Sequence, residues 1–174
     1  MAENYLHSAR LSYRPMEVSD AESAYGQWMN TPELLAAMGT NPMPKSITAM
    51  REYLLHELTN PNIAFFAIRA LNKEPIGCLK LTIDWIHRHA WMSLFIGNIA
   101  DRGHGLGTEA IDCLCDYAFG TLNLHKLSAG ILASNLISQR AFEKAGFKKE
   151  NLRTAQCWVE HHWEDQIIMT RFAP

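Results

Sequence analysis

Three glycines at alternating positions, Gly103, Gly105 and Gly107, most constrain what this chain can fold into. They follow residues 91–97, which read as a strand, and open a segment with helical spacing of apolar residues at Ile111, Leu114, Cys115 and Ala118. A glycine-rich strand-to-helix connection lets the backbone approach a ligand closely. The start of the helix offers unpaired N–H groups and the positive end of its dipole, which favour phosphate. Taken alone, the loop fits a phosphate cradle and a ligand-free turn equally well.

Two common nucleotide-binding loops do not match this segment. A Walker loop needs a lysine directly after its last glycine, and Thr108 stands there instead. The same threonine breaks the G-x-G-x-x-G pattern of dinucleotide-binding folds, and no acidic residue closes the next strand, residues 126–132. Neither of these nucleotide sites is predicted.

The remaining periodic segments predict the fold class. Strands are expected at residues 11–14, 63–70, 76–85, 91–97, 126–132, 154–159 and 163–172. Further helices are expected at residues 21–29, between Ser46 and Asn60, and from Asn135 to Ala145, with turns or irregular connections at residues 31–32, 41–44 and 71–74. This order predicts one α/β (α+β) domain over residues 1–174, with a mixed, mainly antiparallel sheet of about six to seven strands and about four helices.

Composition and charge exclude several classes of protein. The 174 residues carry a formal net charge of −2, which gives no basis for nonspecific nucleic-acid binding. No apolar run is long enough for a membrane span, and residues 1–10 do not resemble a signal peptide. The four cysteines form no C-x-x-C pair, so reduced thiols in a cytoplasmic protein are expected.

Histidines and tryptophans cluster without forming a recognisable site. His87 with His89 and His161 with His162 match no zinc-ligand spacing, so no metal is expected. The tryptophans at 85, 91, 158 and 163 lie on or beside strands, where packing explains them as well as an acceptor pocket does.

Three segments in order resemble the GNAT superfamily of acyl-CoA-dependent N-acetyltransferases. The loop from Arg102 to Gly107 is similar to the family's [Q/R]-x-x-G-x-[G/A] phosphate loop. Residues 135–147 resemble its N-x-x-[SA]-x-x-x-[YF]-E-K-x-G-F helix, and residues 10–21 resemble its first strand and helix. Residues 117–126 are similar to the branch with RimJ/RimL-type protein acetyltransferases and bacterial polyamine acetyltransferases. The resemblance implies the GNAT acyl-CoA N-acyltransferase fold.

The resemblance implies acetyl-CoA as cosubstrate, without a metal. Its pyrophosphate would lie on the backbone N–H groups of the loop, and its pantetheine arm between residues 91–97 and 126–132, with an N–H near Phe95 and Ile96 facing the thioester oxygen. Asn135 is open to two roles, pantetheine contact and helix capping. The implied cofactor-binding residues are Phe95, Ile96, Arg102, Gly103, His104, Gly105, Leu106, Gly107, Thr108, Asn135, Ser138, Phe142 and Lys144, with Arg140 one turn from Lys144.

Proton transfer is less well defined by the sequence. An amine with a pKa near 10 is mostly protonated at neutral pH, so a side chain or an ordered water chain must remove a proton. Asp84, His87, His89 and Glu160 all stay open as that side chain. Many family members have a tyrosine where this chain has Phe142, which cannot donate a proton to the leaving thiolate. The RimL-like branch implies Ser138 as that acid, and helix capping is its alternative role.

Direct transfer of acetyl to a primary amine is therefore the expected function. A protein N-terminus, a polyamine and an amino sugar all fit this branch. Acidic residues at 84, 160, 164 and 165 would favour a cationic acceptor if they line one cleft. A non-catalytic acyl-CoA-binding or protein-interaction module on the same fold is the alternative. The resemblance also implies a homodimer.

Overall fold

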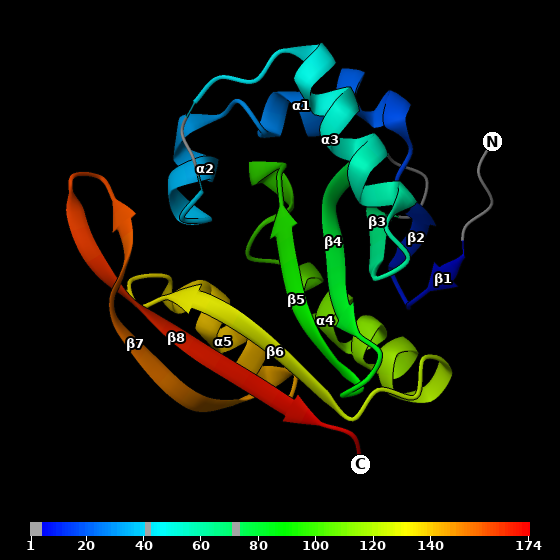
Figure 1. Ribbon diagram of the computed structural model, residues 1–174, viewed down its shortest axis with the longest axis vertical. Coiled ribbons are helices and arrows are strands. Elements are labelled where there is room, and N and C mark those ends of the chain that lie inside the picture. The colour runs from blue at the N-terminus through cyan, green and yellow to red at the C-terminus, as the bar shows by residue number, and fades with distance from the viewer. Residues whose placement is uncertain (1–4, 41–42, 71–73) are drawn as a thin grey trace.

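The computed structural model describes residues 5–40, 43–70 and 74–174, and in these ranges the chain forms eight strands in one sheet and five α-helices (Figure 1). The strands are β1 (Leu6–His7), β2 (Leu11–Pro15), β3 (Ile63–Ala70), β4 (Pro75–Asp84), β5 (His89–Ile96), β6 (Lys126–Leu132), β7 (Lys148–Val159) and β8 (His162–Phe172). The helices are α1 (Ala24–Trp28), α2 (Pro32–Ala37), α3 (Ile47–Thr59), α4 (Leu106–Asp116) and α5 (Leu136–Lys144). None of the helices in these ranges is long and apolar enough to cross a membrane.

One parallel pair interrupts an otherwise antiparallel sheet. The strand order is β1-β2-β3-β4-β5-β6-β8-β7, and only β5 and β6 run parallel. These two strands share three residue pairs, of which Trp91–Ser128 is the last. Beyond it the strands diverge, as Figure 1 shows, and leave a wedge-shaped gap in the sheet between residues 92–96 and 129–132.

Helices cover the two faces of the sheet unequally. The larger apolar cluster packs α4 and α5 on one face, with Ile111, Leu127 and Met169 among its buried members. The smaller cluster packs α1 and α3 on the other face, over β3 to β5, through Tyr25 and Phe65. Because side chains alternate along a strand, odd-numbered residues of β5 face α1, and even-numbered residues face α4.

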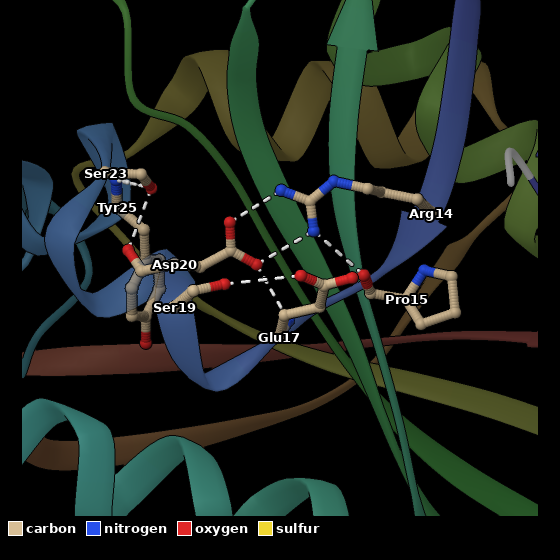
Figure 2. A network of polar contacts seen from close by, with 7 residues as sticks. All are labelled: Arg14, Pro15, Glu17, Ser19, Asp20, Ser23 and Tyr25. Atoms are coloured by element: carbon tan, nitrogen blue, oxygen red, sulfur yellow. Dashed lines mark hydrogen bonds and ion pairs between the residues drawn. The ribbon is translucent and has the colours of Figure 1, made fainter. Parts of the chain in front are cut away.

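A buried ion pair holds the segment before α1 against the sheet (Figure 2). Arg14 in β2 donates to both carboxylate oxygens of Asp20, with Nη2–Oδ1 at 2.6 Å and Nη1–Oδ2 at 2.9 Å. The Glu17 N–H also donates to Asp20 Oδ2, and the Ser23 hydroxyl donates to the Asp20 carbonyl. The hydroxyl oxygen of Ser23 in turn accepts the Tyr25 N–H and caps α1. The entry to α1 is thereby fixed relative to β2.

The fold class expected from the sequence is confirmed, with more elements than expected in the described ranges. The Thr31-Pro32 segment, interpreted as irregular, instead begins α2, because proline suits the first position of a helix. The helix expected at residues 21–29 is divided by Ser23 into a 3₁₀ turn, Val18–Glu22, and α1. Residues 41–42 and 71–73 of the expected connections lie outside the described ranges.

The edge strand β7 also begins earlier than the sequence predicts, at Lys148 rather than about 154. Most of its residues are exposed, so it has no alternation of buried and exposed positions from which its start could be read.

Candidate active site

The glycine-rich loop leaves open space at the start of α4. Gly103 and Gly105 have φ angles of 80° and 78°, a conformation that residues with a side chain rarely adopt. A Cβ atom added at Gly103 or Gly107 would meet nothing within 4 Å. No side chain caps α4 at Gly105. The backbone N–H groups at the helix start are therefore available for an anion.

Polar contacts join this loop and the start of α4 to the turn before β2. The Arg10 guanidinium donates to the His104 carbonyl at 3.0 Å and pairs with Glu109 in α4 at 2.7 Å. Glu109 also accepts from the Ser8 hydroxyl at 2.7 Å. Burial acts to raise the Glu109 pKa, but the hydrogen bonds from Ser8 and Arg10 outweigh it and hold this pKa below its usual value.

The Arg102 side chain is bonded to the backbone at the end of β5. Its Nε donates to the Ile96 carbonyl at 2.9 Å, and its Nη2 donates to the Gly97 carbonyl at 3.3 Å. The guanidinium thus bridges two carbonyl groups at the end of β5 and adds positive charge beside the loop.

The divergence of β5 and β6 leaves backbone groups of β5 without a strand partner. The Gly97 N–H donates to the Ile76 carbonyl at 2.9 Å, so this pair is bonded across β4 and β5. Backbone direction alternates along an antiparallel strand, so Ile96 and Leu94 direct their backbone groups to the other edge; the Ile96 carbonyl accepts from Arg102 there, and the two N–H groups face the gap. Phe95, in contrast, directs its backbone groups to β4. Of the predicted pair, only Ile96 offers its N–H to the gap, and Leu94 is an addition that sequence reasoning missed.

The start of α5 lies beside the open end of the gap, directly after β6. Asn135 caps the helix through Oδ1, which accepts the Ser138 N–H at 3.0 Å. That bond leaves the Asn135 Nδ2 donor for a ligand, so the two roles considered for this residue are compatible. Ser138 is half-buried, and the capping bond uses only its backbone.

Two other predicted residues of α5 differ sharply in position. Phe142 is buried in the core, with its ring edge-on to Phe147 at 4.9 Å between centroids, so it is a packing residue of the helix face. Lys144 is exposed and lines an open groove of about 800 Å³ together with Gly105 and Thr108. Lys144 therefore lies beside the glycine-rich loop.

The structure places the alternative candidates for the base in two separate regions. Asp84 pairs with His89 at the far end of the hairpin, while Gly77 pairs with Ile96. The seven residue steps from His89 to Ile96 correspond to about 23 Å of strand. Glu160 lies in the exposed turn between β7 and β8. A single cleft lined by Asp84 and the three acidic residues of the β7–β8 hairpin is therefore excluded.

The two histidine candidates, His87 and His89, lie near Asp84 and take part in local hydrogen bonds. The His87 N–H donates to Asp84 at 3.0 Å and is the main cause of the lowered Asp84 pKa. His89 Nε2 lies 3.0 Å from the Ser128 hydroxyl, and burial together with Lys126 lowers the His89 pKa. No three His, Cys, Asp or Glu side chains of residues 5–40, 43–70 and 74–174 are grouped as metal ligands would be.

Aromatic residues line the face of the gap that α1 covers. Trp28 and Tyr25 pack on Phe95, with ring centroids 5.8 and 6.5 Å away, and a Cβ atom at Gly97 would lie 2.2 Å from the Trp28 ring. Trp28 and Tyr25 were not singled out from the sequence, although their i, i+3 spacing in a predicted helix is the signal that places them on one face.

Trp91 closes the gap where β5 and β6 part. A Cβ atom at Gly130 would meet the Trp91 ring at 2.8 Å and the Gln166 amide at 2.7 Å, so both side chains cross β6 at this glycine. The Arg153 guanidinium lies over the Trp91 ring, 5.8 Å from its centroid. The two tryptophans of the β7–β8 hairpin, Trp158 and Trp163, pack on each other and are largely exposed.

The four cysteines are free thiols, as expected. Cys78 and Cys115 are buried, and burial raises both thiol pKa values, that of Cys115 to about 12. Cys113 and Cys157 are only partly buried.

Known proteins match this chain over most of its length. Residues 10–148 match the model of the acetyltransferase (GNAT) domain. A probable N-acetyltransferase of Bacillus subtilis, YjcK, is 31% identical over 173 residues, covering 92% of this chain and 93% of that protein.

Two solved structures share the fold. Spermidine N-acetyltransferase from Vibrio cholerae, in complex with CoA and spermine, superposes with a TM-score of 0.88 at 22% identity, over 95% of this chain and 96% of that one. RimL, a ribosomal L7/L12 α-N-protein acetyltransferase in complex with coenzyme A, has a TM-score of 0.88 at 15% identity, over 98% of both chains. With the family model matched over residues 10–148 and a relative 31% identical along nearly the whole chain, this chain belongs to the GNAT family of acetyltransferases.

Proposed function

We propose that this protein transfers the acetyl group of acetyl-CoA to a primary amine by direct attack. The single observation that carries the proposal is the gap between β5 and β6. It leaves the Ile96 and Leu94 N–H groups, which point away from β4, without a strand partner at the end of β5 nearest the glycine loop. The loop binds the pyrophosphate, and the free strand edge binds the amides of the pantetheine arm. Lys144 and Asn135 Nδ2 supply further donors to the same ligand.

The chemistry needs three contributions from the chain. The neutral amine attacks the thioester carbon, and the Ile96 N–H stabilises the negative charge that develops on the carbonyl oxygen. The C–S bond then breaks, and the Ser138 hydroxyl gives its proton to the leaving thiolate. The amine loses its own proton to solvent or a side chain, from which Ser138 is reprotonated. Phe142 takes no part, because it has no hydroxyl and is buried.

The acceptor we favour is a polyamine. The Vibrio cholerae relative with the same fold is a spermidine N-acetyltransferase whose structure contains spermine. RimL acts on a protein N-terminus, so a peptide amine is the second candidate. Both acceptors are primary amines, which the proposed mechanism requires.

Acetyl-CoA binding tests the first step of this proposal. Gly107→Glu places a carboxylate in the open space at the helix start without a strained φ angle, and we expect the calorimetric affinity for acetyl-CoA to fall about tenfold or more. Gly120→Glu is the matched control, because that glycine is exposed and also has nothing within 4 Å. Equal affinity in both variants would refute the loop as the phosphate site.

A further inference from the structure

Three carboxylates are buried in the described part of the chain, and one of them has no cationic partner. Asp20 pairs with Arg14 at 2.6 Å, and Glu57 pairs with Lys80 at 2.7 Å. Glu164 is only 9% exposed, yet none of the described Lys, Arg or His side chains forms an ion pair with it. A buried charge without a partner is unfavourable, so Glu164 is the carboxylate that a ligand would complete.

Glu164 lies at the open end of the gap. Its Oε1 accepts the Ser134 N–H at 2.6 Å, and Ser134 directly precedes Asn135, the cap of α5. Two positions along β8, Gln166 pairs with Leu132, the last residue of β6. Side chains two apart share a face of the sheet, so Glu164 faces the same side as the Gln166 amide, which lies against Gly130 beside Trp91. This is also the face of Phe95 and α1.

Two groups of the neighbouring strand β7, Arg153 and Cys157, do not neutralise Glu164. Arg153 lies over the Trp91 ring and donates to Gln166 Oε1 at 3.5 Å. Cys157, the cross-strand partner of Glu164, has a thiol pKa raised by burial and by the Glu164 charge, so it stays neutral. The backbone N–H of Ser134 satisfies one carboxylate oxygen and leaves the other for a donor from outside the described chain.

We infer that Glu164 binds the non-reacting ammonium group of a diamine or polyamine acceptor. The inference rests on the proposed acetyl transfer and adds the residue that selects the acceptor. A carboxylate beside the attacking nitrogen would hold its proton in place and raise its pKa, so Glu164 suits the second, cationic nitrogen. Ser134, whose N–H holds Glu164, directly precedes the cap of α5, and Ser138 lies in the first turn of that helix, so Glu164 and the proposed acid lie at the same end of α5.

The contact between Glu164 and the second ammonium group is measured by comparing acetyl transfer to 1,4-diaminobutane with transfer to butylamine, which lacks the second nitrogen. We expect the unmodified protein to favour the diamine in kcat/KM by about tenfold or more, as one charge-assisted hydrogen bond would provide. Glu164→Gln keeps an oxygen for the Ser134 N–H but removes the charge, so the preference should disappear while the butylamine rate stays within about twofold. Glu143→Gln, an exposed carboxylate on α5, should retain the full preference.

A second readout does not depend on turnover. In the presence of CoA, 1,4-diaminobutane should raise the melting temperature of the unmodified protein and of Glu143→Gln, but not of Glu164→Gln. The same diamine preference in Glu164→Gln, or the loss of butylamine acetylation together with stability, would overturn the inference and leave Glu164 as a structural clamp. Diamine binding through Glu164 without acetyl transfer would instead contradict the proposed function and keep the binding site.

Discussion

Ser138 can serve both of the roles that sequence reasoning treated as alternatives. Its backbone N–H completes the cap of α5, and its hydroxyl takes no part in that bond. Asn135 is similar, because its Oδ1 caps the helix and its Nδ2 stays available as a donor to a ligand. These roles could not be separated from the sequence, because a capping motif and a ligand contact use the same residue types at the same spacing.

Replacing Ser138 by alanine isolates the hydroxyl. The cap survives, since alanine has the same N–H, so we expect less than about 1 kcal/mol loss of folding free energy. We expect kcat to fall about tenfold or more while the KM for acetyl-CoA changes little, because the proton is needed only when the thiolate leaves. Steady-state kinetics at saturating amine measure both values; an unchanged kcat would exclude Ser138 as the acid.

The loop glycines allow a matched comparison of backbone strain. Gly105 has a φ angle of 78°, so Gly105→Ala should lower the free energy of unfolding by about 1–2 kcal/mol. Gly107 lies in the first turn of α4 with a negative φ angle and open space, so Gly107→Ala should be neutral or stabilise by up to about 1 kcal/mol. Urea denaturation measures both, and equal effects would mean that the loop is not strained at Gly105.

At the scale of elements, the sequence predicts best where a pattern is local. β3 and β6 have the expected bounds, and α3 lies between Ser46 and Asn60, because apolar runs and capping residues mark them. α2 was missed because the same Thr-Pro pair marks a turn and a helix start. The direction of the backbone at Phe95 and Ile96 also escaped prediction, since it depends on the register with β4.

The Arg14–Asp20 pair anchors α1, and its loss should be costly. Both side chains are largely buried, so Asp20→Asn leaves an unpaired guanidinium and should lower the free energy of unfolding by about 3 kcal/mol or more. The ion pair between Arg51 and Glu22 is half-exposed, so Glu22→Gln should change it by less than about 1 kcal/mol. Urea denaturation of the two variants compares them; similar losses would contradict the anchoring role.

Glu109 links the start of α4 to the turn before β2, and its lowered pKa gives a pH signature. A carboxyl group whose pKa is lower in the folded state stabilises fully above its unfolded pKa, near 4.3, and loses this contribution as the pH falls through the folded value. Between pH 6 and pH 3 the unmodified protein should therefore lose more stability than Glu109→Gln. Parallel stability curves for the two proteins would show that Glu109 is not held by Ser8 and Arg10.

At the scale of the whole molecule, the sheet consists of two halves joined by three residue pairs between β5 and β6. The glycine loop, the proposed phosphate site, was predictable because its three glycines lie close together in the sequence. The lack of a cationic partner at Glu164 was not predictable from the sequence. It depends on which groups Arg14, Lys80 and Arg153 contact in three dimensions.

Amide hydrogen exchange reports on the gap directly. The N–H groups of Leu94 and Ile96 face it, so they should exchange faster than those of Ser93 and Phe95, which face β4. Saturating acetyl-CoA should slow exchange at Leu94 and Ile96 about tenfold or more and leave β1 and β2 unchanged. Protection confined to other strands would place the ligand elsewhere.

Release of free CoA thiol from acetyl-CoA, followed across spermidine, 1,4-diaminobutane, a short peptide and an amino sugar, tests acetyl transfer most directly. We expect amine-dependent thiol release, greatest with the polyamines, that Gly107→Glu reduces and Gly120→Glu does not. Thiol release that no amine increases, or that is equal in both variants, would contradict the assignment of this protein as an amine acetyltransferase working through the glycine loop.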